Sequence, residues 1–237
     1  MQKKNKEVKI ISEVYPQHNG SITELKRSIL LSKLGGASFA KLQLYSSEKL
    51  FGNKDRSYLD IKFDELKELK EFADQNDIEI FASIFDEDKI EWCEKLNFKF
   101  YKIASRTVEN KELCEKIISC NKTTFISLGM YDWKKNGLPF NGEKIKYFYC
   151  VSKYPTMLGE LEFPNFQDKK IEGYSDHTIG ISACLKAICK GATYVEKHFS
   201  MNKSANINTE LAHVCSMDFD DLKLLKELSD SLSIIKD

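Results

Sequence analysis

The sequence predicts a (β/α)8 barrel, the TIM-barrel fold, as a single domain over residues 1–237. Short apolar runs rich in β-branched and aromatic residues alternate eight times with charged, amphipathic segments. This alternation is typical of parallel strands joined by helical crossovers. Eight such units close into a barrel, whereas doubly wound sheets usually contain fewer strands. Continuous apolar runs such as FASIF and FISLGM indicate strands that are buried on both faces.

The predicted units follow one another along the chain. The first strand covers residues 8–14 and precedes a helix capped by Ser21, with Glu24 at the spacing of a capping box. The remaining strands are apolar runs of the same kind, over residues 38–45, 78–85, 99–104, 123–128, 147–152, 171–174 and 193–199. Amphipathic helices are expected over residues 64–74, 86–96, 109–119 and 180–190, and from about residue 218 to the end. The connections after the fifth and sixth strands, with YDWKKNGLPFNG and with Pro155 and Pro164, are poor helix formers, so two units have degraded helices.

Composition and charge narrow the class of protein. The 237 residues are 42% hydrophobic, and 36 basic residues balance 36 acidic ones. Such a chain can bury a core, and it lacks the basic stripe of a nucleic-acid or membrane-surface binder. No apolar run has the length of a membrane span and no signal peptide is evident. The seven cysteines include no CxxC pair, which argues against a thiolate metal site, and we expect a soluble, cytoplasmic protein.

Polar or ionisable residues stand at the C-terminal ends of the predicted strands, where barrels of this kind place their reacting groups. They are Glu13, Lys41, Gln43, Ser83, Lys102, Ser105, Ser127, Ser152, Tyr154, Ser175, His177, Glu196 and His198. A buried charge is costly unless it is paired, so a ring of such groups predicts an occupied polar site.

Two histidines end neighbouring strands and are placed to reach the same mouth. A two-histidine site with open positions suits a divalent metal acting as a Lewis acid. The alternative is that His177 and His198 are hydrogen-bonded residues of the barrel top, and their spacing leaves both readings open. Glu196 lies on the same face of the strand as His198 and is placed either to orient it or to take part directly.

Two lysines, Lys41 and Lys102, lie in otherwise apolar strands. Such lysines form a Schiff base, bind an anionic substrate, or make salt bridges, here with Glu13 or Glu196. The serines of the same rim add neutral donors, and together these groups suit a ligand that carries a phosphate and a carboxylate.

Seven short strings, in order along the chain, carry a resemblance to a known family. They are EVYPQHNG, AKLQLYSSEKL, FASIFD, FYKIAS, FISLGM, CVSKYPT and GYSDHTIGISACLKAICKGATYVEKHFSMNK. In these strings, from about residue 10 to residue 225, the chain resembles the barrel domain of the sialic acid synthase (N-acetylneuraminate synthase) family. Members of that family condense phosphoenolpyruvate with an N-acetylated amino sugar.

The resemblance implies roles for the site residues. His177 and His198 would hold Mn²⁺ or Mg²⁺, which would polarise the open-chain sugar aldehyde for attack by the methylene carbon of phosphoenolpyruvate. Glu13 would be the acid/base carboxylate, and Gln43 and Tyr154 would lie toward the sugar. Phosphoenolpyruvate would be held by Lys41, Lys102, Ser105, Ser127 and Ser175, with Ser83 and Ser152 standing where the family shows Thr and Asn. Glu196 completes the expected catalytic set with Glu13 and the two lysines.

Three departures from the family concern the acceptor sugar. KIASRT places Arg106 where the family has glycine and Thr107 where it has a sugar-facing carboxylate. ELAH keeps His213 but has Ala212 in place of an aspartate. The small C-terminal antifreeze-like domain, which gives an arginine to the partner subunit's sugar site in the family, is not expected here.

Two functions therefore stay open. The first is a carbon–carbon bond-forming transferase that joins phosphoenolpyruvate to a non-standard amino-sugar acceptor. The second is a barrel of the same family that has lost turnover, or that depends on a partner, and acts as a binding or accessory protein. A Schiff-base aldolase built on Lys41 or Lys102 is a third reading. A homodimer, or a separate chain that supplies the missing cap, is left open, and no nucleic-acid or membrane partner is expected.

Overall fold

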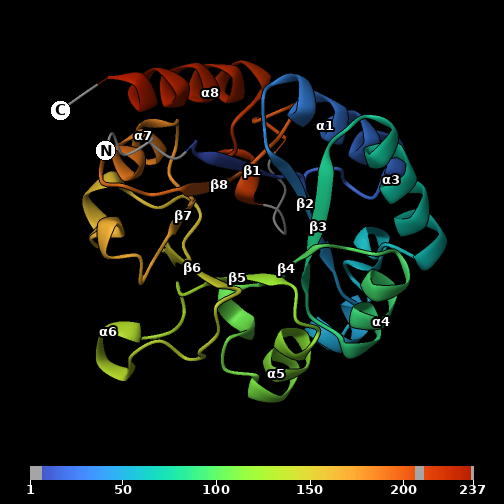
Figure 1. Ribbon diagram of the computed structural model, residues 1–237. Helices are drawn as coiled ribbons and strands as arrows, with labels where there is room; N and C mark the ends of the chain where they lie inside the picture. Colours follow the sequence, from blue (N-terminus) through green and yellow to red (C-terminus); the bar gives the residue numbers. More distant parts are fainter. Residues whose placement is uncertain (1–6, 206–210, 236–237) are drawn as a thin grey trace.

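The computed structural model describes residues 7–205 and 211–235, and its strands form a closed parallel barrel (Figure 1). The strands follow one another around the ring in sequence order. They are β1 (Lys9–Glu13), β2 (Phe39–Leu44), β3 (Glu79–Ile84), β4 (Phe100–Ile103), β5 (Thr123–Ser127), β6 (Ile145–Cys150), β7 (Gly173–Asp176) and β8 (Tyr194–His198). β8 pairs with β1 to close the ring, and Glu13 stands opposite His198 in that register. The predicted (β/α)8 fold is confirmed.

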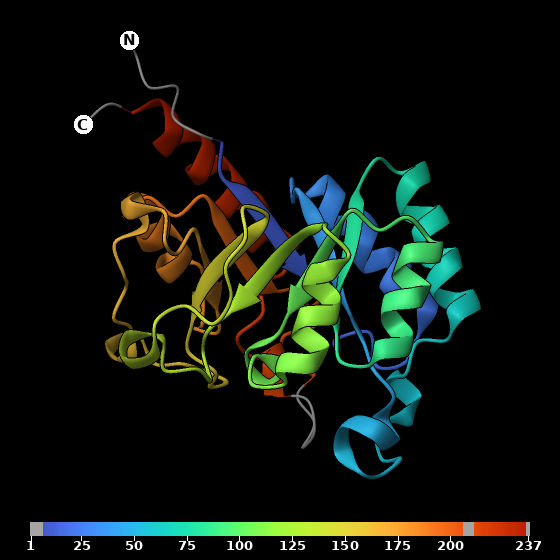
Figure 2. The ribbon, with the colours of Figure 1, turned by 60° about the horizontal axis from the view of Figure 1, so that its bottom comes forward.

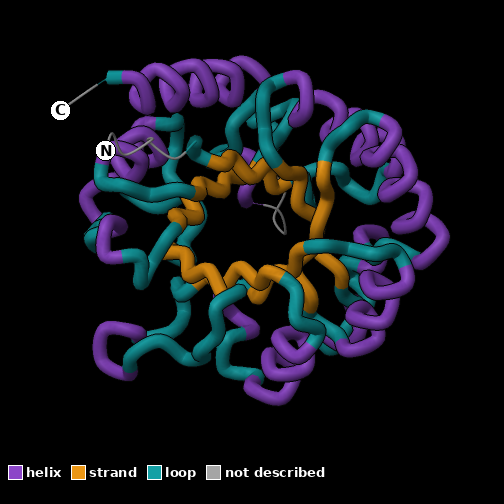
Figure 3. The backbone as a smooth tube through the Cα atoms, in the orientation of Figure 1, coloured by secondary structure: helices purple, strands orange, loops and turns teal. Residues whose placement is uncertain are grey.

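Helices surround the ring of strands (Figure 3). The longer ones are α1 (Ile22–Leu34), α3 (Phe63–Gln75), α4 (Glu87–Lys95), α5 (Lys111–Ser119), α7 (Ser182–Cys189) and α8 (Phe219–Ile234). Ser21 caps α1 as predicted, since its side chain accepts a hydrogen bond from the backbone N–H of Glu24 at 3.2 Å. Among residues 7–205 and 211–235, no helix is long and apolar enough to cross a membrane.

The two units with degraded helices also appear in the structure. After β5 the chain forms only α6 (Trp133–Asn136), and after β6 it forms 3-10 turns at Leu158–Glu160 and Phe166–Asp168. This side of the barrel is therefore covered by loops rather than by full helices, as Figure 1 shows around α6.

The connection between β2 and α3 contains structure that the sequence analysis did not predict. A short helix, α2 (Ser47–Phe51), and a 3-10 turn at Ser57–Leu59 form an excursion that stands out at the lower right of Figure 2. The Asp60 carboxylate accepts hydrogen bonds from the backbone N–H (3.0 Å) and hydroxyl (2.6 Å) of Ser47. These contacts join residues 13 positions apart, so no periodic pattern in the sequence predicts them.

Aromatic rings fill the floor of the barrel. They belong to Phe39, Phe81, Phe100, Phe125, Phe148 and Tyr194, with neighbouring ring centroids 5.0–6.3 Å apart. Gly173 gives Phe148 the space it needs, because a Cβ at Gly173 would lie 2.5 Å from the Phe148 ring. Strand side chains alternate in direction, so the residue two positions after each ring points into the barrel one layer higher.

A pair of oppositely charged side chains is buried between β7 and β8, outside the aromatic floor. The Lys197 ammonium donates to the Asp176 carboxylate (2.8 Å) and to the Thr178 carbonyl (2.6 Å). Both side chains are essentially inaccessible to solvent. Asp176 also accepts hydrogen bonds from the Tyr174 hydroxyl and the Thr178 N–H, both at 2.8 Å. If either Asp176 or Lys197 is removed, the other is left as a buried charge without its ion-pair partner.

We expect Lys197→Met to lower the free energy of unfolding by about 3–5 kcal/mol, because it leaves the Asp176 carboxylate buried without its cation. Chemical denaturation would measure the change. The double variant Asp176→Asn, Lys197→Met should regain part of the loss. Lys95→Met, which breaks the exposed Lys95–Glu91 pair on α4, is the control and should cost about 0.5 kcal/mol or less. Equal losses for Lys197→Met and Lys95→Met would contradict the structural role of the buried pair.

Candidate functional site

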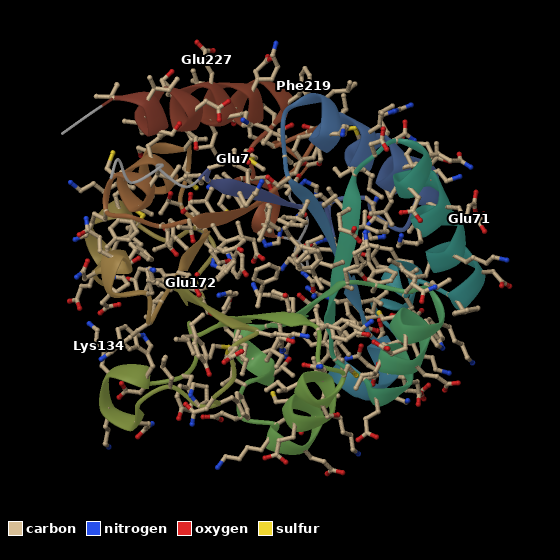
Figure 4. The ribbon with its side chains drawn as sticks, viewed as in Figure 1. Glu7, Glu71, Lys134, Glu172, Phe219 and Glu227 are labelled. Carbon is tan, nitrogen blue, oxygen red and sulfur yellow. The ribbon has the colours of Figure 1, made fainter. Side chains whose placement is uncertain are left out.

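A cavity of about 550 Å³ opens at the C-terminal ends of the strands. In Figure 4, side chains converge on the centre of the barrel, whereas labelled charged residues such as Glu71 and Lys134 lie on its outer surface. Every residue that the sequence analysis places at the site lines this cavity: Glu13, Lys41, Gln43, Ser83, Lys102, Ser105, Ser127, Ser152, Tyr154, Ser175, His177, Glu196 and His198. Strand order and the shared edge of the sheet therefore bring them together.

Four buried charges form the deep part of the cavity. The Lys41 ammonium lies 2.6 Å from a Glu13 carboxylate oxygen and 3.1 Å from a Glu196 oxygen. The Lys102 ammonium donates to both oxygens of Glu196, at 2.9 and 3.0 Å. Glu196 thus bridges two ammonium groups that would otherwise repel each other, as the salt-bridge reading of these lysines predicted.

Three of the four charges of this cluster lie one layer above the aromatic floor. Lys41, Lys102 and Glu196 follow Phe39, Phe100 and Tyr194 by two positions on their strands. The Lys102 ammonium also lies 5.0 Å from the centroid of the Phe148 ring. The floor excludes water from below, and charges interact more strongly in such a low-dielectric setting.

Burial and neighbouring charges shift the pKa values of the cluster in different directions. Burial lowers the pKa of Lys102 to about 8; Glu196 opposes this shift and the charge of Lys41 adds to it. Burial alone would lower the pKa of Lys41, but Glu13 and Glu196 hold it above its ordinary value. The pKa of Glu196 lies well below its usual range because Lys102 and Lys41 outweigh the effect of burial. Burial raises the pKa of Glu13, and Lys41 reduces that rise.

The serines of the cavity differ in what they contact. The Ser175 hydroxyl donates to Glu196 at 2.9 Å, and Ser83 accepts from the Lys41 ammonium at 3.4 Å. The Ser105 hydroxyl oxygen accepts from the Gly129 N–H at 3.0 Å. The Ser127 hydroxyl is buried and has no hydrogen-bond partner among the described residues. A buried polar group without a partner costs free energy, which a ligand at this position would relieve.

The two histidines are held in a defined orientation. His177 Nδ1 lies 2.7 Å from the Val151 carbonyl oxygen, so this nitrogen carries the proton and donates it. His198 Nδ1 faces the Gln17 side-chain oxygen at 3.2 Å in the same way. The rings are 5.8 Å apart between centroids, and Nε2 of each is left as an acceptor. Burial, with the nearby charge of Lys41, lowers the pKa of His198 well below its ordinary value, so its ring is neutral.

This arrangement fits a divalent metal ion. Metal-ligating histidines almost always donate their other ring N–H to a carbonyl or carboxylate, as both rings do here. Within the described ranges no group of three or more His, Cys, Asp or Glu residues gathers in metal-binding geometry. A metal ion here would have two histidine ligands from the described residues, and water or substrate would occupy its other coordination positions.

The structure places the Glu196 carboxylate against the two lysines and not against the ring nitrogen of His198. Its carboxylate bonds to Lys41, Lys102 and Ser175, whereas Gln17 is the residue that contacts His198 Nδ1. The strand pattern placed Glu196 on the correct face but could not show which neighbour it meets across the barrel.

Most of the residues expected near the sugar line the cavity, but one of them does not. The Tyr154 ring packs on His177 with centroids 4.0 Å apart, and Gln43 donates to Glu13 at 3.4 Å. Arg106 and Ala212 line the cavity. Thr107 is buried in the 3-10 turn Ser105–Thr107 and is not a lining residue, so of these two residues only Arg106 lines the cavity.

Sequence reasoning missed several residues of the site, among them Gln17, Arg56 and Cys150. Gln17 contacts His198 from the loop after β1; it lies within the string EVYPQHNG, but no role was drawn from it because a neutral amide in a loop does not indicate its partner. Arg56 lines the cavity from the excursion after β2, far from any strand end. Cys150 also lines the cavity, and it could have been found, because it follows Phe148 by two positions as the polar site residues follow their rings.

The chain is similar to several known proteins. A model of the NeuB family matches residues 28–235. N,N'-diacetyllegionaminic acid synthase of Campylobacter jejuni is 29% identical over 252 residues, which cover 93% of this chain and 75% of that protein. An uncharacterized protein of Methanocaldococcus jannaschii is 32% identical over 211 residues; the match covers 82% of this chain and 63% of that relative, less than two thirds of its length.

A solved structure shares the fold. The N-acetylneuraminic acid (sialic acid) synthetase of Leptospira borgpetersenii, crystallised with citrate, superposes with a TM-score of 0.85 at 24% identity. The match covers 97% of this chain and 85% of that one. The resemblance drawn from the seven strings is thus confirmed by the family model, and the chain belongs to the NeuB family.

Proposed function

We propose that this protein condenses phosphoenolpyruvate with an amino-sugar aldehyde and yields a sialic-acid-like nonulosonate and phosphate. The observation that carries the proposal is the buried cluster of Glu13, Lys41, Lys102 and Glu196, open to a cavity beside two oriented histidines. Relatives named as legionaminic, pseudaminic and N-acetylneuraminate-9-phosphate synthases support this class of reaction.

Phosphoenolpyruvate carries a phosphate and a carboxylate, which match the donors of the deep cavity. The two ammonium groups offer charge-assisted hydrogen bonds, and the open Ser127 hydroxyl adds a neutral one. In the free chain Glu13 and Glu196 neutralise both lysines, so the cluster tolerates burial until the ligand arrives. Ser105, Ser152 and Ser175 lie around the same space as further contacts.

Glu13 is placed to move the proton that the reaction requires. As the methylene carbon of phosphoenolpyruvate bonds to the aldehyde carbon, the aldehyde oxygen needs a proton to become a hydroxyl. Burial raises the pKa of Glu13, which eases the uptake of a proton by its carboxylate and suits this donor role. The resulting carboxylate can accept a proton from the water that adds to the former enol carbon, and loss of phosphate then leaves the keto acid.

A divalent ion held by Nε2 of His177 and His198, Mn²⁺ or Mg²⁺, would supply Lewis-acid polarisation of the aldehyde carbonyl. Gln43, on β2, and Tyr154, in the loop after β6, line the cavity from opposite sides of the ring and would orient the acceptor. Holding both reactants in one closed space removes much of the entropic barrier to their encounter.

The direct test mixes the purified protein with phosphoenolpyruvate, Mn²⁺ and a panel of N-acetylated aldoses, and follows phosphate release and keto-acid product. Phosphate release that depends on the acceptor supports the proposal. Phosphoenolpyruvate that binds but stays intact with every acceptor would instead favour a binding or accessory barrel.

We expect Lys102→Met to weaken phosphoenolpyruvate binding by at least about tenfold, because a charged hydrogen bond to the ligand is lost. Isothermal titration calorimetry would measure it. Glu196 keeps its contact with Lys41, so the barrel should still fold, as thermal melting would verify. Lys99→Met removes an exposed lysine at the opposite end of the same strand region and is the control. Unchanged binding by Lys102→Met would refute the assignment of this pocket.

Binding of phosphoenolpyruvate should also weaken at alkaline pH. The pKa of Lys102 is lowered to about 8, and its cationic form is the one that attracts the ligand. We therefore expect the association constant to be highest below this pKa and to fall up to about tenfold per pH unit above it. Lys41, whose pKa is raised, stays charged over this range. A flat profile between about pH 7 and about pH 10 would contradict this role of Lys102.

Metal binding has its own test, independent of turnover. Paramagnetic resonance of free Mn²⁺ should show that His198→Ala no longer binds the ion. Gln17→Ala keeps both ligands but loses the group that orients His198, so its affinity should fall about 10–100-fold. Wild-type affinity in the His198→Ala variant would rule out this site.

A further inference from the structure

We infer that the acceptor carries an oxyanion, a phosphate or a carboxylate, away from its aldehyde end, and that Arg106 and Arg56 bind this group at the rim of the cavity. This inference rests on the proposed function, since it names the class of acceptor. It follows from the placement of two guanidinium groups, from the aromatic ring that supports them and from the charge balance of the cavity.

Arginine is rare in this chain, and its placement is uneven. The sequence contains three arginines, Arg27, Arg56 and Arg106, and lysine supplies all its other permanent cations. Arg27 lies on α1 and pairs with Glu24 of the same helix at 3.0 Å. The other two come from connections about 50 positions apart, yet both line the cavity. A guanidinium binds a phosphate or carboxylate through two parallel hydrogen bonds, which a lysine cannot reproduce.

One aromatic ring supports both groups. The Phe51 centroid lies 5.0 Å from the Arg56 guanidinium carbon and 5.3 Å from that of Arg106. Phe51 ends α2 and packs edge-on against the buried Tyr45, with centroids 5.6 Å apart. Stacking on the ring orders the Arg106 guanidinium, so that it loses less freedom when its N–H edge binds an anion.

The rim of the cavity and its deep part differ in whether their cations are paired with carboxylates. Below, Lys41 and Lys102 are matched by Glu13 and Glu196. At the rim, no carboxylate oxygen within residues 7–205 and 211–235 lies at ion-pair distance from the Arg106 guanidinium. Arg106 therefore carries a positive charge that no described carboxylate pairs with, and an incoming anion would do so.

The two levels of the cavity then recognise different reactants. Lys102 is 1% exposed and suits the small, deeply held phosphoenolpyruvate, whereas Arg106 is exposed at the opening. An acceptor whose aldehyde reaches Glu13 and the two histidines extends outward past Gln43, with its far end toward the excursion after β2. An anionic group at that far end would meet Arg106.

The test compares three acceptors: N-acetylmannosamine, its 6-phosphate, and N-acetylmannosaminuronic acid, which carries a carboxylate at the same carbon. For each we would measure kcat/KM for phosphate release, and binding in the presence of phosphoenolpyruvate by calorimetry. We expect at least one anionic acceptor to exceed the neutral sugar by about tenfold or more in kcat/KM. The two anionic arms show whether the rim prefers a phosphate or a carboxylate.

The variants are Arg106→Gln and, as matched control, Arg27→Gln. Arg106→Gln should lower the preference for the anionic over the neutral acceptor by about 10–100-fold, and Arg106→Lys should restore part of it. Arg27→Gln should leave the preference unchanged. Because Arg106 is exposed, its replacement should not affect folding, and thermal melting would verify this.

Two results keep this inference distinct from the proposed function. Turnover with equal efficiency on neutral and anionic acceptors, unaffected by Arg106→Gln, would overturn the rim site and leave the condensation standing. Absence of turnover with every acceptor, together with Arg106-dependent binding of an anionic sugar, would support the rim site and overturn the condensation. If no anionic acceptor binds or reacts better than the neutral sugar, the rim site is refuted.

Discussion

Glu196 lies between two buried ammonium groups, and the mouth of the barrel depends on this contact. Lys41 and Lys102 come from β2 and β4, and without the carboxylate from β8 their charges would repel each other in a space that water barely enters. Glu13 completes the balance from β1. The chain can thus hold two cations deep in its core before any ligand is present, which isolated buried lysines could not do at neutral pH.

The aromatic floor and the charged layer above it arise from the same strands. A period of two places a ring and then a polar group on the inner face, as in Phe39 and Lys41 or Tyr194 and Glu196. The floor supplies packing and stability, while the layer above supplies charge and hydrogen bonds. Shifting one strand by a single residue would break both layers together, because it would turn every inward side chain outward.

Much of the fold and of the deep cavity could be predicted because each rests on periodicity. Alternating strands and helices predict the barrel, and strand ends predict a shared mouth, so residues such as Lys102 and His177 could be named before any contact was known. Contacts that follow no periodic pattern in the sequence could not be predicted. Gln17, Arg56 and the excursion held by Asp60 depend on where loops fold back, and the partner of Glu196 depends on which inward side chains meet across the ring.

The excursion after β2 has a consequence for how such a protein can diversify. It begins only after β2 has ended; the Asp60 carboxylate closes it on itself, and the Asp86 carboxylate ties its start to the connection after β3. A segment of this kind can be lengthened, shortened or exchanged without altering strand register. Changes to this one loop can therefore alter the part of the cavity that it lines, while the charged cluster at the centre of the barrel stays the same.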